Sequence, residues 1–324
     1  MTLGALGYVG YGKETTEGVT VAPTIFLPVS SFSFEDTNDY IVPDQIRHGR
    51  DRSVLVAAPY STSGTMDMEL ITTGFGPLLR SALSAPDAGI ATTAYTGGGY
   101  QHVITPGSSG PTFTFEGSLA DILVMRYGGI RVNTLEVSAA FGEIATASFG
   151  LEGTTRVKQL TPATVLDIPE TPLAFSGASV KVAGANVANV KAFTWNIGNN
   201  LDRIGTLRKT RSWSRTALGL RDVGLSLTLD FTNTADYDLF LNETEFSVQL
   251  HLEGPTAPAG SAGWTTARPA LVLDFPRVRW GSVGVPLSST DYLEQSVEAV
   301  VMKPATGGAA IMTATLVSMD PTII

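Results

Sequence analysis

The sequence predicts an all-β protein built from two tandem β-sandwich or partial-barrel domains, each carrying one short α-helix. Three observations support this fold class. Short runs of alternating apolar and polar residues, bounded by Gly, Pro, Asn and Asp, recur along the chain. Helical spacing of apolar residues is confined to two segments, and the order of strands and helix is repeated in the two halves. The 324 residues suffice for two domains of ordinary size.

The expected strands are the clearest alternating runs. The two expected helices each follow a Thr or Asn that can cap a helix, and each places apolar residues three and four positions apart. The helices are Thr72–Leu83 and Thr232–Asn242, and the strands are Thr24–Phe34, Gly64–Leu70, Thr112–Phe115, Val132–Ala139, Ala145–Leu151, Val190–Ile197, Leu225–Phe231, Phe246–Leu252, Ala270–Phe275 and Ala310–Ser318.

The repeat consists of five features that occur in the same order at a nearly constant offset. A strand ending in an Asx-rich turn is followed by a charged loop, then by a strand that leads into the helix, and then by two further strands. Two unrelated all-β domains also share strands and turns, but the common order and the single helix per half favour a tandem duplication. The alignment matches Pro28 with Asn189, Gly64 with Gly224, Leu135 with Leu293, and the loop Tyr40–Ser61 with Leu201–Leu220.

The duplication divides the chain into four parts. Residues 1–22 form a Gly-rich N-terminal arm, residues 23–160 the first domain and residues 173–324 the second domain. The Pro-rich segment 161–172 is the expected linker between them.

Composition excludes several classes of function. The net charge of −9 disfavours tight wrapping of nucleic acid. The absence of cysteine removes disulfides, thiolate nucleophiles and cysteine-bound zinc. No apolar stretch has the length of a membrane span, and the first residues lack the pattern of a secretory signal, so we expect a protein made inside the cell with no membrane partner.

Recognised catalytic and metal-binding patterns are also missing. His48, His102 and His251 have no partners at metal-ligand spacing, and no G-x-S-x-G motif provides a nucleophile elbow. Asp67 and Glu69 share one face of a strand, which is typical of a solvated face. We therefore expect no enzyme, no catalytic residues, no metal and no cofactor.

The N-terminal stretch Gly7–Glu14 matches seven positions of the phosphate-binding pattern G-x-x-x-x-G-K-[ST]. That pattern requires a preceding strand and a following helix, and the sequence favours neither. Glu14 stands where a hydroxyl is required, and its carboxylate would repel phosphate. A nucleotide site is therefore disfavoured.

Two loops concentrate basic residues. Residues 203–221 carry Arg208, Arg211 and Arg215 around Trp213, and Arg47, Arg50 and Arg52 alternate with acidic residues in the first half. Basic residues around an aromatic side chain can bind nucleic acid. Mixed charge together with Arg and Trp favours instead an interface with another copy of the chain.

The first hundred residues resemble the tail tube (major tail) proteins of long-tailed bacteriophages. The resemblance rests on a G-x-G-x-E-x-x-x-G stretch (Gly10, Gly12, Glu14 and Gly18), an I-R-x-G-R-like loop from Ile46 and the strand-to-helix segment Gly64–Leu83. It implies a tail tube fold and a structural role in the virion tail, in a protein made in the host cytoplasm. It also implies stacked rings around a channel for double-stranded DNA, with tape measure and tail terminator proteins as partners.

Further expectations combine this resemblance with the repeat. The family builds a ring from six tube domains, so two domains per chain give a homotrimeric ring, with a hexamer of chains as the alternative. The resemblance implies that the N-terminal arm packs on a neighbour, with Tyr8 and Tyr11 in the interface. The acidic balance predicts a net negative lumen.

Two other classes of function remain open at this point. A monomeric two-domain β-sandwich that binds carbohydrate or a host surface would cluster aromatic residues on one exposed face. A hydrolase would show a deep pocket with a perturbed carboxylate or histidine.

Overall fold

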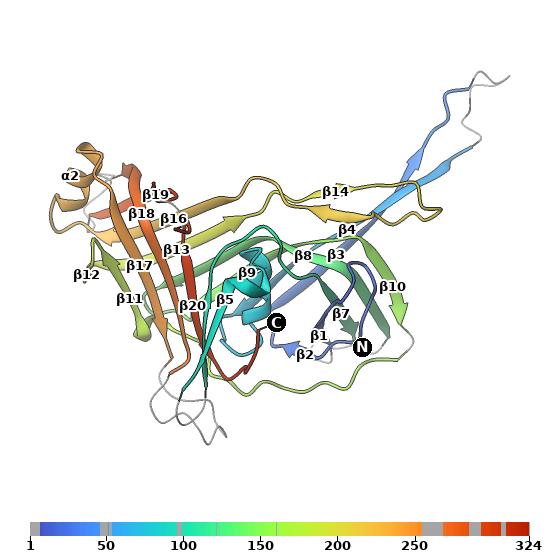
Figure 1. The fold of residues 1–324 in the computed structure, drawn as a ribbon, viewed down its shortest axis with the longest axis horizontal. Coiled ribbons are helices and arrows are strands. Elements are labelled where there is room, and N and C mark those ends of the chain that lie inside the picture. Colours follow the sequence, from blue (N-terminus) through green and yellow to red (C-terminus); the bar gives the residue numbers. More distant parts are fainter. Residues whose placement is uncertain are drawn as a thin grey trace.

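A computed structural model describes residues 7–45, 51, 54–95, 99–120, 122–159, 161–254, 268–284, 293–305 and 309–323. Within these residues the chain is mostly antiparallel β-structure with two short α-helices (Figure 1), so the predicted all-β class is confirmed. The first half contains β1 Tyr8–Lys13, β2 Ile25–Leu27, β3 Ser31–Ile41, β4 Val56–Glu69, α1 Gly76–Ala82, β5 Ile90–Ala94, β6 Tyr100–Ile104, β7 Phe113–Leu119, β8 Leu123–Ala140, β9 Thr146–Gly153 and β10 Thr155–Gln159. The second half contains β11 Ala178–Val182, β12 Ala185–Val187, β13 Val190–Gly198, β14 Asp202–Ile204, β15 Arg215–Ala217, β16 Asp222–Asp230, α2 Ala235–Leu241, β17 Phe246–Glu253, β18 Ala270–Gly284, β19 Glu294–Val301 and β20 Thr313–Ser318. Single 3-10 turns cover Asp87–Gly89 and Phe175–Gly177.

Both helices lie inside the predicted segments, but neither has a side-chain cap bond. The turn before α1 is held by distant carboxylates instead. Glu170 accepts hydrogen bonds from the backbone N–H groups of Thr72 and Thr73, both at 2.8 Å, and Asp320 accepts one from Gly74 at 2.7 Å. Carboxylates placed near free N–H groups at a helix start stabilise it.

Strand β8 is long enough to belong to two sheets. Its first part pairs with β7 and β10, and its second part pairs with β9 and β13. Gly129 lies at the bend with φ +65°, a conformation that favours glycine. A register shift in the pairing with β7, next to this bend, redirects the strand.

The two halves are joined by direct strand pairing. Residues Thr134–Ala140 of β8 pair antiparallel with Ala192–Gly198 of β13, which continues the sheet as β3–β4–β9–β8–β13–β16–β19. The C-terminal strand β20 also pairs with β6. One hydrophobic cluster contains buried residues from both halves, so residues 161–172 connect parts of a single packed unit.

Strand pairing follows the same order in the two halves. In the first half β1 pairs with β2 and β7, β7 with β8, β8 with β9 and β10, β9 with β4, and β4 with β3. In the second half β11 pairs with β12 and β17, β17 with β18, β18 with β19 and β20, β19 with β16, and β16 with β13. Among the described residues of the second half, strands β5 and β6 have no counterpart.

Irregularities occur at matching places as well. The β7–β8 register shifts between Phe113↔Ile130 and Phe115↔Tyr127, and the β17–β18 register shifts between Phe246↔Val278 and Val248↔Phe275. Each helix is followed by a non-glycine residue of positive φ, Ser84 at 48° and Glu243 at 47°. These coincidences support common descent of the halves, which we propose.

The sequence alignment of the halves needs two corrections. Gly64 lies opposite Leu151, which faces Val132 at the register shift of β8, and Leu225 lies opposite Ala299, which faces Trp280 at the matching shift of β18. Gly64 therefore corresponds to Leu225 and not to Gly224. A slip of one residue would reverse the faces of the strand. Leu135 lies in β8 and Leu293 lies just before β19, whereas the pairing order matches β8 with β18 and β9 with β19.

Two predicted loops have more structure than expected. Tyr40, Ile41 and Val56–Ser61 continue the β3–β4 hairpin, which projects from the body of the protein at the end away from α2 (Figure 1). Leu201–Leu220 forms the two-stranded ribbon of β14 and β15.

Candidate assembly surface

The N-terminal stretch is an internal strand of the chain, not an arm extended toward a neighbour. Strand β1 lies between β2 and β7. Tyr11 is 1% exposed, and its hydroxyl donates to the carbonyl of Gly74. A Cβ on Gly10 would come within 2.8 Å of the Phe26 ring, and one on Gly12 within 2.5 Å of the Ala22 carbonyl oxygen. The glycines therefore allow close packing within the chain itself, and Tyr11 is not available to a neighbour.

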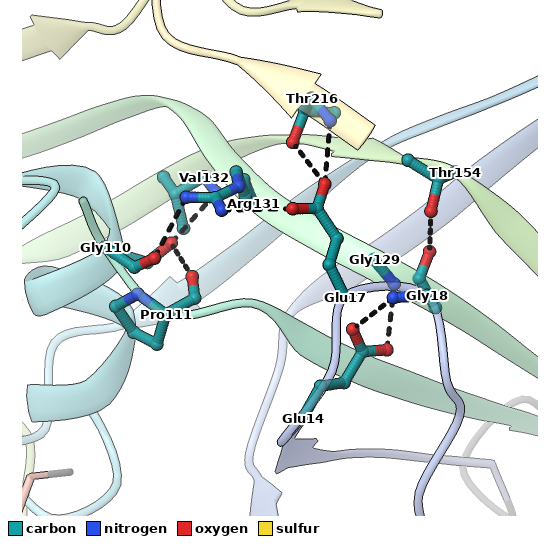
Figure 2. A network of polar contacts seen from close by, with 12 residues as sticks. Glu14, Glu17, Gly18, Gly110, Pro111, Gly129, Arg131, Val132, Thr154 and Thr216 are labelled. Carbon is teal, nitrogen blue, oxygen red and sulfur yellow. Dashed lines mark hydrogen bonds and ion pairs between the residues drawn. The ribbon is translucent and has the colours of Figure 1, made fainter. Parts of the chain in front are cut away.

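Two glutamates fix the segment that follows β1 (Figure 2). The buried Glu14 carboxylate accepts hydrogen bonds from the backbone N–H groups of Gly18 and Gly129 at 2.8 Å and from the Thr114 hydroxyl at 2.8 Å. Burial raises the pKa of Glu14, and these hydrogen bonds oppose the rise. The phosphate-binding pattern is therefore part of a packed strand and turn.

Glu17 joins this segment to the second half. Its carboxylate accepts from the Thr216 backbone N–H at 2.7 Å and lies 3.2 Å from an Arg131 guanidinium nitrogen (Figure 2). The turn after β1 is thus attached to β8 and β15 at once.

Several residues expected at an interface make contacts within the chain. Tyr8 donates a hydrogen bond to Glu116. The Nε of Arg211 donates to the Ala58 carbonyl at 2.7 Å, and the indole Nε1–H of Trp213 donates to the Tyr60 carbonyl at 2.8 Å. Arg211 and Trp213 therefore attach the β14–β15 ribbon to the β3–β4 hairpin.

Other predicted interface residues remain on the surface. Arg208 is exposed and donates to the Trp213 carbonyl at 2.9 Å, and Arg215 is exposed. Arg47, Arg50 and Arg52 lie outside the described residues, as does His48.

The projecting part of the β3–β4 hairpin carries exposed apolar side chains that the sequence analysis missed. A signal was present, because apolar residues flank the charged residues of the segment that was predicted to be a charged loop. Exposed apolar side chains that cluster together mark interaction surfaces. The exposed residues are Tyr40 at 56%, Ile41 at 56%, Val42 at 42%, Val54 at 41%, Leu55 at 59% and Val56 at 47%.

The continuous sheet presents one face to the core and an opposite face that is polar. Cross-strand partners on the polar face fall into rows because paired residues of adjacent strands point to the same side. One row runs through Ser31, Asp67, Ser148, Glu136, Asn196, Gly224 and Val300 and ends at Arg279 of β18. A second row runs through Glu69, Thr146, Ser138, Thr194, Ser226, Glu298 and Ser282. Arg279 is the only Lys or Arg of the two rows, and its guanidinium bonds to Glu245 at 2.5 Å.

Hydrogen bonds order the acidic groups of this polar face. Asp67 accepts from the hydroxyls of Ser148 and Ser31, which lower the pKa of its carboxyl. The Asp67 carboxylate therefore stays charged at neutral pH. Lys191 also reaches this face, where its Nζ lies 2.7 Å from a Glu294 carboxylate oxygen. The face as described is hydroxyl-rich and acidic.

The described histidines, which could have indicated catalysis or metal binding, make contacts within the fold. His102 is buried, with ring nitrogens 3.0 Å from the Thr92 hydroxyl and 2.8 Å from the Asp320 carbonyl oxygen. His251 lies 3.9 Å from Glu253. Among the residues that the structure describes, no cluster of three or more His, Asp or Glu side chains has the geometry of a metal site.

Comparison with known families decides between the open interpretations. The sequence model of the phage tail tube protein matches residues 4–317, nearly the whole chain. The chain belongs to this family. No curated protein matches the sequence at a significant level.

Membership assigns the tail tube protein to the virion tail, as a structural component that assembles with itself and other tail components. It disfavours the carbohydrate-binding and hydrolase interpretations. In the described part of the chain, neither helix has the length and apolar character needed to cross a membrane.

Proposed function

We propose that this tail tube protein assembles into stacked rings that enclose the channel for genome delivery into the host. Double-stranded DNA passes through without being held, and tape measure and tail terminator proteins contact the tube. Synthesis in the host cytoplasm belongs to the same proposal, as does the absence of catalysis and of a cofactor.

The polar face of the continuous sheet is the observation that supports a channel lining best. Its two rows hold four carboxylates, Asp67, Glu136, Glu69 and Glu298, mostly among hydroxyl, amide and glycine positions, and one cation, Arg279, at the β18 end. Phosphate groups are repelled by carboxylates and find no cluster of cations there. A wall of this chemistry lets DNA slide, because its carboxylates outnumber its cations and Arg279 is already paired with Glu245.

We infer a ring of three chains with pseudo-sixfold symmetry. Each half contributes a set of strands with the same pairing order, so three chains provide six equivalent sets. A head-to-tail contact gives a closed ring when the rotations between successive copies add up to a full turn. Three chains, each made of two similar halves, would place six halves around such a ring. A ring of six chains is the alternative, in which the second half would lie outside the wall.

Contacts between stacked rings are assigned to the β3–β4 hairpin and the β14–β15 ribbon. The hairpin projects from the body and carries exposed apolar residues, and the ribbon exposes Leu207, Arg208 and Arg215. Arg47, Arg50 and Arg52 of the intervening segment are proposed to take part. Apolar contacts supply affinity and charges select the partner surface.

Electron microscopy of the purified protein tests the proposed function. Rings or tubes are expected, and a protein that stays monomeric at high concentration would contradict it. In tubes mixed with linear duplex DNA at low salt, we expect no retention on the lumen wall. A Glu136→Lys and Glu298→Lys variant should retain DNA in a salt-dependent manner, and Lys181→Glu, which changes a charge on β11 outside the two rows, serves as the control.

A further inference from the structure

The contact between the two halves of one chain indicates how one chain contacts the next. We propose that the outer edge of β3 pairs antiparallel with the C-terminal part of β18 of a second copy, in the register by which β13 pairs with β8 within the chain. This inference rests on the proposed ring and specifies its interface.

The two edges involved are the counterparts of the two edges that meet inside the chain. Strand β13 is paired on both sides, with β16 and β8. Its counterpart β3 pairs only with β4 among the described residues. The second part of β8 is paired on both sides, with β9 and β13. In the described residues, the counterpart segment Arg279–Gly284 of β18 pairs only with β19. Unpaired strand edges are templates for pairing with another chain.

The register follows from the matching irregularities. Ile130 corresponds to Val278 at the first shift, and Thr134 corresponds to Ser282 at the second. Phe34 corresponds to Trp195 through their partners on β4 and β16. The internal pairs Gly198↔Thr134 and Asn196↔Glu136 then translate into contacts between two copies. These are Thr37 of one copy with Ser282 of the next, and Glu35 with Gly284.

This register continues the polar face of the sheet from chain to chain. Thr37 and Glu35 share their side of β3 with Ser31 and Ser33, because strand side chains alternate. Ser282 lies opposite Glu298 on the polar face. A shift by one residue would place this polar row against the core, so the register is strongly specified.

Burial of the core-facing side chains shows what is missing at β3. Phe193 and Trp195 of β13 are 3% and 0% exposed beneath the joined sheets. Their counterparts Phe32 and Phe34 are only half-buried. A groove of about 810 Å³ lies beside them, between β3 and the sheet of β1, β7 and β8. Pairing with β18 of a neighbour would cover this groove as β8 covers β13.

The helices show the same asymmetry. Every residue of α1 is buried, whereas none of α2 is, and Leu241 of α2 is 60% exposed. Asn199 directly follows β13. Its side-chain amide donates to the Ala82 carbonyl of α1 at 2.8 Å and to the Val132 carbonyl of β8 at 2.9 Å, and so connects the helix to the sheet. The counterpart of Asn199 is Asn38 on β3. We expect its side-chain amide to donate to the Trp280 carbonyl of the next copy, which corresponds to that of Val132.

Cysteine pairs test the register directly because the native chain has no cysteine. The variant Thr37→Cys/Ser282→Cys places two sulfurs on facing positions of adjacent copies. The variant Asp36→Cys/Ser282→Cys is the matched control, since residue 36 points to the opposite face. The internal pair Thr134→Cys/Gly198→Cys reproduces the same geometry within one chain and calibrates the reaction.

Assembled protein is oxidised and analysed on non-reducing gels. We expect T37C/S282C to form covalent dimers and trimers at a yield similar to the internal pair, and D36C/S282C to form at least tenfold less. No link in T37C/S282C while the internal pair forms would overturn the proposal, as would equal yields in the two inter-chain variants.

Single variants keep the test informative if a double variant fails to fold. T37C mixed with S282C before assembly should yield hetero-dimers, and neither variant alone should form a bond. Absence of hetero-dimers in tubes visible by microscopy would overturn the proposed edge and leave the tube function intact. Absence of tubes in the native protein would instead overturn the function. A ladder reaching six chains would retain the edge and replace the trimer by a hexamer.

Discussion

Replacing Asn199 by alanine should destabilise the chain strongly, because this side chain connects α1 to the sheet that joins the two halves. Asn199 is 2% exposed, donates to two carbonyl groups and accepts a hydrogen bond from Ser84 at 3.3 Å. Each hydrogen bond contributes about 1 kcal/mol net, and buried carbonyls left unpaired cost about 1–3 kcal/mol each. The expected loss in the free energy of unfolding is about 2–4 kcal/mol.

Urea unfolding of unassembled protein, followed by tryptophan fluorescence, measures this loss. With a slope of about 3 kcal/mol per molar urea, the midpoint should fall by about 1 M. Asn38→Ala is the matched control, because Asn38 lies on the outer strand and accepts a hydrogen bond from Arg156 at 2.8 Å near the surface. It should lose less than about 1 kcal/mol but assemble poorly. Equal losses for the two variants would refute the correspondence between these residues.

The remaining predictions concern pH, the N-terminal strand and the ribbon. Burial raises the pKa of Asp320 from 3.8 to about 6, so its folded form binds the proton more tightly and stability should fall as pH rises from about 4 to 6. The loss in the free energy of unfolding is about 3 kcal/mol at most, and Asp320→Asn should remove it. Burial lowers the pKa of His102, so this histidine changes stability with pH in the opposite direction, and it does so equally in the native chain and in the variant. If the midpoint of thermal unfolding changed with pH in the same way in Asp320→Asn and in the native chain, this prediction would be contradicted. Tyr11→Phe should lower the free energy of unfolding by about 1–2 kcal/mol yet still yield tubes, because the Tyr11 hydroxyl bonds within the chain. Loss of tubes with unchanged stability would instead support the interpretation of the N-terminal stretch as an assembly arm. Arg208→Ala/Arg215→Ala should retain the native circular dichroism and give single rings rather than tubes by negative-stain microscopy, and long tubes would exclude these residues from ring stacking.

Strands with one face in the core were predictable because burial imposes alternation. Leu225–Phe231 and Phe246–Leu252 alternate cleanly, and the structure places strands there. The hairpin beyond Tyr40 was assigned as a loop because its outer part is exposed on both faces, which removes the alternation. The resemblance implied that the Gly-rich N-terminal stretch packs on a neighbour, whereas the glycines of β1 are required where Phe26 and the Ala22 carbonyl of the same chain approach.

The candidate surface could be predicted only in part. Each strand of the polar face shows Ser, Thr or Glu at alternate positions, but the rows arise from register, which depends on pairings between distant segments. The pairing of Leu135–Ala140 with Ala192–Ile197 leaves no local signature. The alignment of the segment from Leu135 with the segment from Leu293 failed for a related reason. Both segments lie on strands of the continuous sheet with the same alternation, so their similarity reflects a shared face rather than corresponding positions.

A three-dimensional reconstruction of assembled tubes by electron cryomicroscopy tests the central claim most directly. The account predicts three chains per ring, a wall in which β8–β13 and β18–β3 contacts alternate, and the row containing Asp67 and Glu136 facing the lumen. Six chains per ring with the second half outside the wall, or a lumen lined by arginine, would contradict it.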